Sequence, residues 1–93
     1  MIFWSRTENG WAVNLDGTDA ATEYALPRLE LRSSSLGWVC ACHLADGTTR
    51  LVPLGRPGGV AEAKRLAIEG SLGAFVGEYE ADLRALLEEP GLR

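Results

Sequence analysis

A glycine- and proline-rich stretch near the middle of the chain, Gly55-Arg56-Pro57-Gly58-Gly59, separates two parts of different character. Before it, turn residues alternate with short β-prone runs. After it, residues 60–89 have high helix propensity and are followed by Pro90-Gly91. Strands that precede helices, instead of alternating with them, are typical of the α+β class. We therefore expect a single α+β domain over residues 1–93, with a sheet at 1–54, a linker at 55–59 and a helical segment at 60–89.

The N-terminal part predicts a β-hairpin around Asn9-Gly10, because this dipeptide suits the two positive-φ positions of a type I′ turn. A two-residue turn at this point would pair Glu8 with Trp11 and Trp4 with Leu15. One face of the hairpin is then apolar and faces the core. Its residues are Ile2, Trp4, Trp11, Val13 and Leu15.

A third strand is predicted from Tyr24 to Arg32, in which Leu29 and Leu31 point to the core. Pro27 cannot donate a ladder hydrogen bond, so we expect it at an edge or at the start of this strand. Together with the hairpins on either side, this strand predicts an antiparallel meander of about four to five strands.

The dipeptide Asp46-Gly47 predicts a second hairpin, which in a two-residue turn would pair Cys42 with Leu51 and Ala41 with Val52. Both faces of this hairpin are then largely apolar, and such a strand pair is usually covered on both sides. The helical segment supplies one cover, and the second points to a partner. The face that needs the second cover consists of Val39, Ala41, Val52 and Leu54.

Large apolar residues gather on one side of the second half of the helical segment, where they form a stripe that we expect to pack on the sheet. We expect a short helix near 60–69, a break at Gly70–Gly73, and a longer helix near 72–89 that carries this stripe: Leu72, Phe75, Val76, Tyr79, Leu83 and Leu86. The alternative is one continuous helix whose small residues allow a second helix to approach closely: Ala63, Ala67, Gly70, Ala74, Gly77, Ala81 and Ala85.

Composition and charge narrow the classes of partner. Apolar residues make up 46% of the chain, charged residues make up 24%, and the net charge is −4, with the acidic excess in the helical part. Nonspecific affinity for nucleic acid comes chiefly from clustered Lys and Arg, so this balance favours a basic protein partner. No apolar run is long enough for a membrane span, and the N-terminus lacks a secretory leader, so we expect a cytoplasmic protein that does not bind membranes.

The sequence Cys40-Ala41-Cys42-His43 is the one cluster of potential metal ligands, and its spacing does not suit a structural zinc site. On a strand, His43 points away from both thiols, which also argues against a Cys–His catalytic pair. The two Cα atoms would lie about 6.7 Å apart, too far for a disulfide, so we expect free thiols in a reducing compartment. We predict no catalytic residue, metal or cofactor, and hence no enzyme.

Three features in order along residues 36–70 suggest a known family. Gly37-Trp38 opens a strand, Asp46-Gly47 forms a turn before the next strand, and Val60-Ala61-Glu62-Ala63-Lys64 enters a helix. This order resembles the three-strand-and-helix arm-binding domain of phage integrases, which implies a sheet that reads DNA. In its size, acidity and two-Trp N-terminal hairpin, the whole chain also looks like the short proteins that phages and mobile elements encode, some of which inhibit host enzymes or defence complexes.

Our leading hypothesis is a non-enzymatic protein-binding module, of the kind that phages use to inhibit or regulate a host protein complex. Its partner would be another protein, with a homodimer as a further form, and the binding residues would be Val39, Ala41, Val52, Leu54, Glu78 and Asp82. The alternative is a small nucleic-acid-binding domain that reads DNA or RNA with its sheet through Arg28, Arg32, Arg50 and Arg56.

Overall fold

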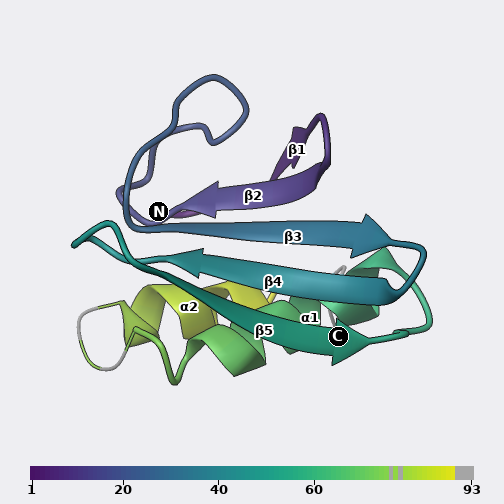
Figure 1. Cartoon of the computed structure of the whole chain (residues 1–93). Coiled ribbons are helices and arrows are strands. Elements are labelled where there is room, and N and C mark those ends of the chain that lie inside the picture. The colour runs from purple at the N-terminus through teal and green to yellow at the C-terminus, as the bar shows by residue number, and fades with distance from the viewer. Residues whose placement is uncertain (76, 78, 90–93) are drawn as a thin grey trace.

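The computed structural model describes residues 1–75, 77 and 79–89. Over these residues the chain forms two layers, a five-stranded antiparallel sheet and two helices on one face of it (Figure 1). The strands lie in chain order, so the predicted α+β meander is confirmed. The elements are β1 (Ser5–Thr7), β2 (Gly10–Asn14), β3 (Arg28–Ser34), β4 (Gly37–His43), β5 (Thr49–Gly55), α1 (Val60–Ser71) and α2 (Glu80–Leu87).

The first hairpin has the predicted faces but a different turn. Arg6 pairs with Trp11 and Thr7 with Gly10, so the loop is Glu8-Asn9 and the predicted pairing is wrong by two residues. Gly10 lies inside β2, where an added Cβ would lie 2.1 Å from the Leu31 carbonyl oxygen, so β3 leaves room only for glycine. A shift of two residues keeps every side chain on its face. The expected apolar residues therefore still line or flank the core: Ile2, Trp4, Trp11, Val13 and Leu15.

The second hairpin is shifted by one residue from the predicted register, with Cys40 opposite Val52 and Ala41 opposite Leu51. A one-residue shift moves the side chains of β5 to the other face of the sheet. Val52 and Leu54 therefore pack against the core, and Leu51 points outward. The prediction that Val52 and Leu54 share the outer face with Val39 is wrong.

The cause of this shift is a three-residue loop. The Leu44 N–H donates to the Thr48 carbonyl over 2.8 Å, and the Gly47 N–H donates to the Leu44 carbonyl over 3.0 Å, with Gly47 at φ 89°. This is a type I turn followed by a left-handed residue. The Asp46 carboxylate fixes it by accepting hydrogen bonds from the Thr48 N–H and hydroxyl, which lowers the pKa of Asp46.

The first helix packs on the sheet, whereas the prediction gave this role to the second helix. The longer helix is α1, which contacts β3, β4 and β5, and the shorter α2 packs against α1. The predicted break exists, since α1 ends at Ser71 and α2 begins at Glu80. Three of the four buried residues of α1 are small, namely Ala63, Ala67 and Ser71, so this helix can approach the sheet closely. Val76 of the predicted stripe lies outside the described residues.

The Lys64 side chain joins α1 to the tryptophans of the first hairpin, and Arg6 of β1 contacts one of them. The Lys64 ammonium lies 3.5 Å from the centre of the Trp11 ring and 5.8 Å from that of Trp4, and the Arg6 guanidinium lies 5.3 Å from the Trp11 ring. Such cation–π contacts are favourable when the cation is partly desolvated. Burial lowers the pKa of Lys64. In the described part of the chain, no helix is long and apolar enough to cross a bilayer.

Candidate functional site

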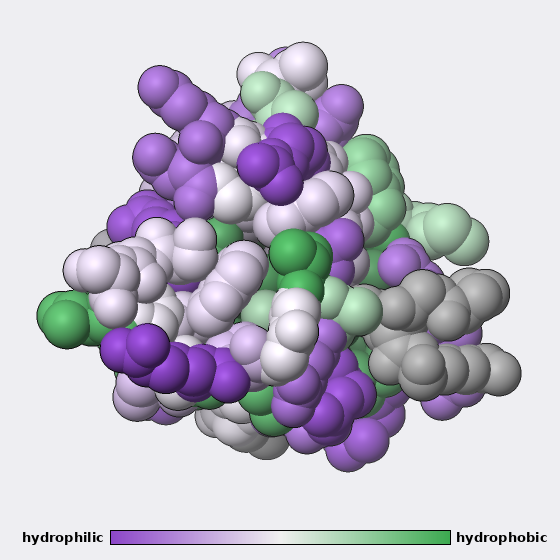
Figure 2. Space-filling model, turned by 90° about the vertical axis from the view of Figure 1, so that its right-hand side faces the viewer, coloured by the Kyte–Doolittle hydropathy of each residue, from purple (hydrophilic) through white to green (hydrophobic). Residues whose placement is uncertain are grey.

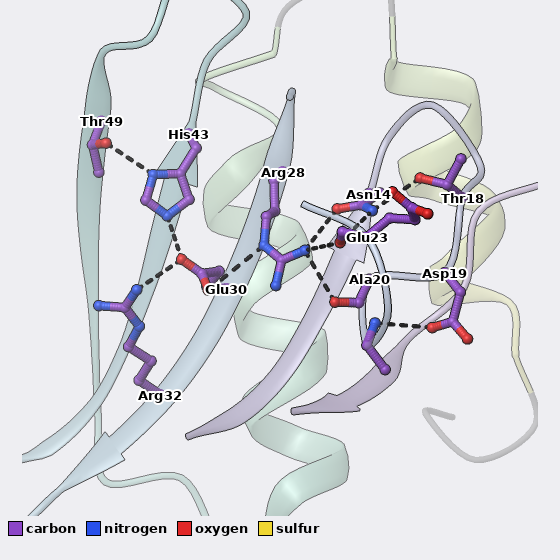
Figure 3. Close-up of polar contacts among 11 residues, drawn as sticks. Asn14, Thr18, Asp19, Ala20, Glu23, Arg28, Glu30, Arg32, His43 and Thr49 are labelled. Carbon is purple, nitrogen blue, oxygen red and sulfur yellow. Dashed lines mark hydrogen bonds and ion pairs between the residues drawn. The ribbon is translucent and has the colours of Figure 1, made fainter. Parts of the chain in front are cut away.

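The outer face of the sheet, opposite the helices, is half covered by the connection between β2 and β3, residues 15–27. Arg28 anchors this connection: its Nη1 donates to the Asn14 amide oxygen (2.9 Å) and to the carbonyls of Ala20 (3.1 Å) and Glu23 (3.0 Å). The Ser5 hydroxyl adds a hydrogen bond to the Asp19 carboxylate. Figure 3 shows Arg28 of β3 reaching Asn14, Ala20 and Glu23. The chain itself therefore covers the β1–β3 half of the outer face.

Glu30 stands at the centre of the outer face and joins three cationic or polar side chains (Figure 3). Its carboxylate accepts hydrogen bonds from Arg32 (2.7 Å) and His43, and the Arg28 Nε lies 3.6 Å away. Burial acts to raise the pKa of Glu30, but the His43 hydrogen bond and the nearby positive charges together hold it below its ordinary value. His43 continues the network to the Thr49 hydroxyl on β5.

Tyr24 caps this network from the solvent side. Its ring lies 4.7 Å from the Arg28 guanidinium and 6.1 Å from the His43 ring, while 64% of the residue remains exposed. The charged groups of the network are therefore engaged with one another and partly shielded, and the arrangement stabilises the sheet.

The β4–β5 half of the outer face lacks such a cover among the described residues. Val39 and Pro53 are paired neighbours, and Leu51, two residues before Pro53, is 67% exposed. We call Val39, Leu51 and Pro53 the apolar face. Leu36, in the β3–β4 turn, is 88% exposed. At the end of the molecule where this turn lies, hydrophobic areas are small and separated by hydrophilic ones (Figure 2).

The structure places the predicted partner-binding residues on different surfaces. Val39 and Ala41 lie on the outer face, where Ala41 is buried between its neighbours. Val52 and Leu54 face the helices. Asp82 is exposed on α2, in the other layer, and Glu78 lies outside the described residues.

The four arginines of the nucleic-acid hypothesis also fail to share one surface. Arg28 is buried, and Arg32 is paired with Glu30. Arg50 lies opposite Cys42, so its side chain leaves the sheet on the helix side. Arg56 follows β5 and reaches the Ser35 carbonyl at 3.5 Å.

The two cysteines lie in the core with their Sγ atoms 4.0 Å apart, and His43 points to the opposite face of the sheet. The hydrogen bond with Cys42 and burial raise the pKa of the Cys40 thiol, which keeps it protonated and unreactive. No three His, Cys, Asp or Glu residues come together as metal ligands in the described part of the chain.

Neither of two surface hollows lined by the described residues brings a nucleophile next to a base. The larger, of about 330 Å³, lies between the β4–β5 turn and the segment after α1, and its acidic group, Asp46, is engaged with Thr48. The smaller, of about 150 Å³, lies between the N-terminus and α2, with the exposed carboxylates of Asp82 and Glu89 at its rim.

The sequence did not predict the network around Glu30 or the unpaired edge of β5. The alternation Arg28-Leu29-Glu30-Leu31-Arg32 placed the three charged residues on one face, but the two positions across the strand pair, His43 and Thr49, depended on the register. Comparison with known proteins finds no match to a protein-family model, a curated protein or a solved structure. The interpretation of this surface therefore depends on its geometry.

Proposed function

We propose that this chain is a non-enzymatic protein-binding module that acts through the apolar face. The observation that supports this is the uneven cover of the sheet: residues 15–27 cover the β1–β3 half, whereas Leu51 is 67% exposed beside Val39 and Pro53. Apolar side chains that lie together at a rim of polar residues are typical of interaction surfaces.

A module of this kind works by occupying a surface of another protein, as a phage-type inhibitor or regulator of a host protein complex does. The buried free thiols Cys40 and Cys42 support a reducing, cytoplasmic location for this action. The nucleic-acid alternative has less support, because Arg28 is buried within the protein and Glu30 neutralises Arg32. Binding to a phosphate backbone requires cations that are free to contact it.

The proposal is tested by placing a photo-crosslinking amino acid at Pro53 in one variant and at Asp82 in another. Asp82 is the matched control, because it is also exposed but lies on α2. We expect a covalent adduct in cells from position 53 that excess native chain suppresses, and none from position 82. The protein in the adduct, once purified, should bind the native chain and should bind a Val39→Glu variant at least tenfold more weakly.

Crosslinking from position 82 alone would move the binding surface to the helical layer and contradict the proposal. Equal affinity of the purified partner for the native chain and the Val39→Glu variant would contradict it as well.

A further inference from the structure

The edge strand β5 is open along its length. It ends the sheet order, and in the described part of the chain no further strand pairs with its outer side. Thr49, Arg50, Leu51 and Pro53 are all exposed. An unpaired edge of this kind is a template for another extended strand.

The register identifies which backbone groups point away from β4. The Leu44 N–H donates to the Thr48 carbonyl, so the ladder bonds recur at every second pair, at Cys42–Arg50 and Cys40–Val52. The backbone groups of Thr49 and Leu51 therefore point to the open edge. Pro53 also points there and presents a carbonyl without an N–H, which is the position that an edge strand tolerates for proline.

We propose that the apolar face and the β5 edge bind a second copy of this chain, with the two β5 strands antiparallel and Leu51 opposite Leu51. In this register each Leu51 exchanges two backbone hydrogen bonds with its counterpart. Thr49 of each copy lies opposite Pro53 of the other. The Thr49 N–H then donates to the Pro53 carbonyl, and at each such pair the missing N–H of Pro53 is the one ladder bond that is lost. The two sheets then form one continuous sheet. This homodimer rests on the proposed protein-binding function, for which it identifies the partner as a second copy of the chain.

Charge favours this occupant and this register. Antiparallel pairing about Leu51 brings the start of one β5, which follows the Asp46 turn, to the end of the other, which is followed by Arg56. An acidic residue of one copy and a basic residue of the other therefore lie at each end of the pair. A register centred on Arg50 would instead place two arginines directly opposite each other, and like charges at that spacing are destabilising. The single-residue difference between the two registers therefore selects Leu51 as the centre.

The first test measures the mass of the purified native chain by light scattering after size exclusion, from micromolar to millimolar concentration. We expect the mass to rise from that of the 10.0 kDa chain to twice that value. Leu51→Pro removes the outward N–H and leaves the ladder to β4 intact, so this variant should stay at the mass of one chain throughout.

The second test does not depend on how well Leu51→Pro folds. In the proposed dimer, Leu51→Cys places two thiols on a hydrogen-bonded pair with Cα atoms about 5.5 Å apart, a distance that suits a disulfide. The matched control is Thr49→Cys, whose thiols would be four residues apart along the strand, about 13 Å. Mild oxidation should give a covalent dimer of the first variant and at least tenfold less of the second.

A native chain that keeps the mass of one chain up to millimolar concentration would overturn the inference, and so would equal crosslinking of the two variants. These measurements use the purified chain alone. If they fail while the adduct from position 53 persists in cells, the homodimer is wrong and the protein-binding function stands with another partner.

Discussion

At the scale of single residues, Glu30 contacts charged or polar neighbours from two strands on the outer face: Arg28, Arg32 and His43. Its carboxylate connects β3 to β4 through His43 and neutralises Arg32 and the buried Arg28. Arg28 in turn holds the covering connection through Asn14 and two carbonyls. A buried cation such as Arg28 is costly without a carboxylate beside it. The charged state of Glu30 therefore supports both the sheet and its cover.

This role predicts a pH dependence of stability. The pKa of Glu30 is lower in the folded chain than in the unfolded chain, so the unfolded chain binds more protons in acid. The stability that Glu30 contributes is present above its unfolded pKa, about 4.3, and is lost as the pH falls through the folded value. Urea unfolding at pH 7 and at pH 3 should show this loss, and Glu30→Gln should reduce it.

At pH 7, Glu30→Gln should lower the free energy of unfolding by about 1–3 kcal/mol, because it removes the negative charge beside the buried Arg28 guanidinium. The matched control is Glu69→Gln, which breaks the exposed ion pair with Arg65 on α1 and should cost less than about 1 kcal/mol. Equal losses in the two variants would contradict the role assigned to Glu30.

At the scale of elements, the close approach of α1 to β5 explains why the longer helix covers the sheet. An added Cβ at Gly70 would lie 2.7 Å from a Cγ atom of Val52, whose branched side chain has little rotational freedom. At Gly70 the helical segment therefore packs closely against a strand.

Gly70→Ala should lower stability by about 1–3 kcal/mol through this overpacking, although Gly to Ala within a helix is normally stabilising by about 1 kcal/mol. The additional change Val52→Ala removes the clashing atoms, so the effect of Gly70→Ala should reverse in that background. Gly73→Ala is the control, because its nearest neighbour would lie 4.0 Å away. Thermal unfolding of the four variants measures all of these effects, and a stabilising Gly70→Ala in the native background would contradict the packing.

The sequence predicts the fold class and most of the core because both depend on short-range patterns. The alternation around Leu29 and Leu31, the Trp positions and the glycine-rich linker all correctly indicate strands followed by helices. The face of β5 depends on whether the Asp46-Gly47 turn closes with two residues or three, a choice made by the Asp46–Thr48 hydrogen bonds. The cover of the β1–β3 half depends on contacts of Arg28 that are distant in sequence.

At the scale of the whole molecule, the two faces of the sheet are covered by different segments and to different extents. The helices pack on one face, where α1 contacts β3, β4 and β5, and residues 15–27 lie over the β1–β3 part of the other. The remaining half adjoins the free edge of β5, so the exposed apolar side chains and the unpaired backbone groups lie together. The sequence indicated that this hairpin needs a partner, and the structure narrows the proposed contact to the β5 strand around Leu51.

Amide hydrogen exchange of the native chain at several protein concentrations tests the β5–β5 pairing at the level of single backbone groups. We predict that the amides of Thr49 and Leu51 become at least tenfold slower to exchange as concentration rises, because pairing gives them acceptors. The amide of Val52 faces β4 and serves as the internal control. Exchange at Thr49 and Leu51 that is fast at every concentration, or protection that develops on α2 instead, would contradict the account.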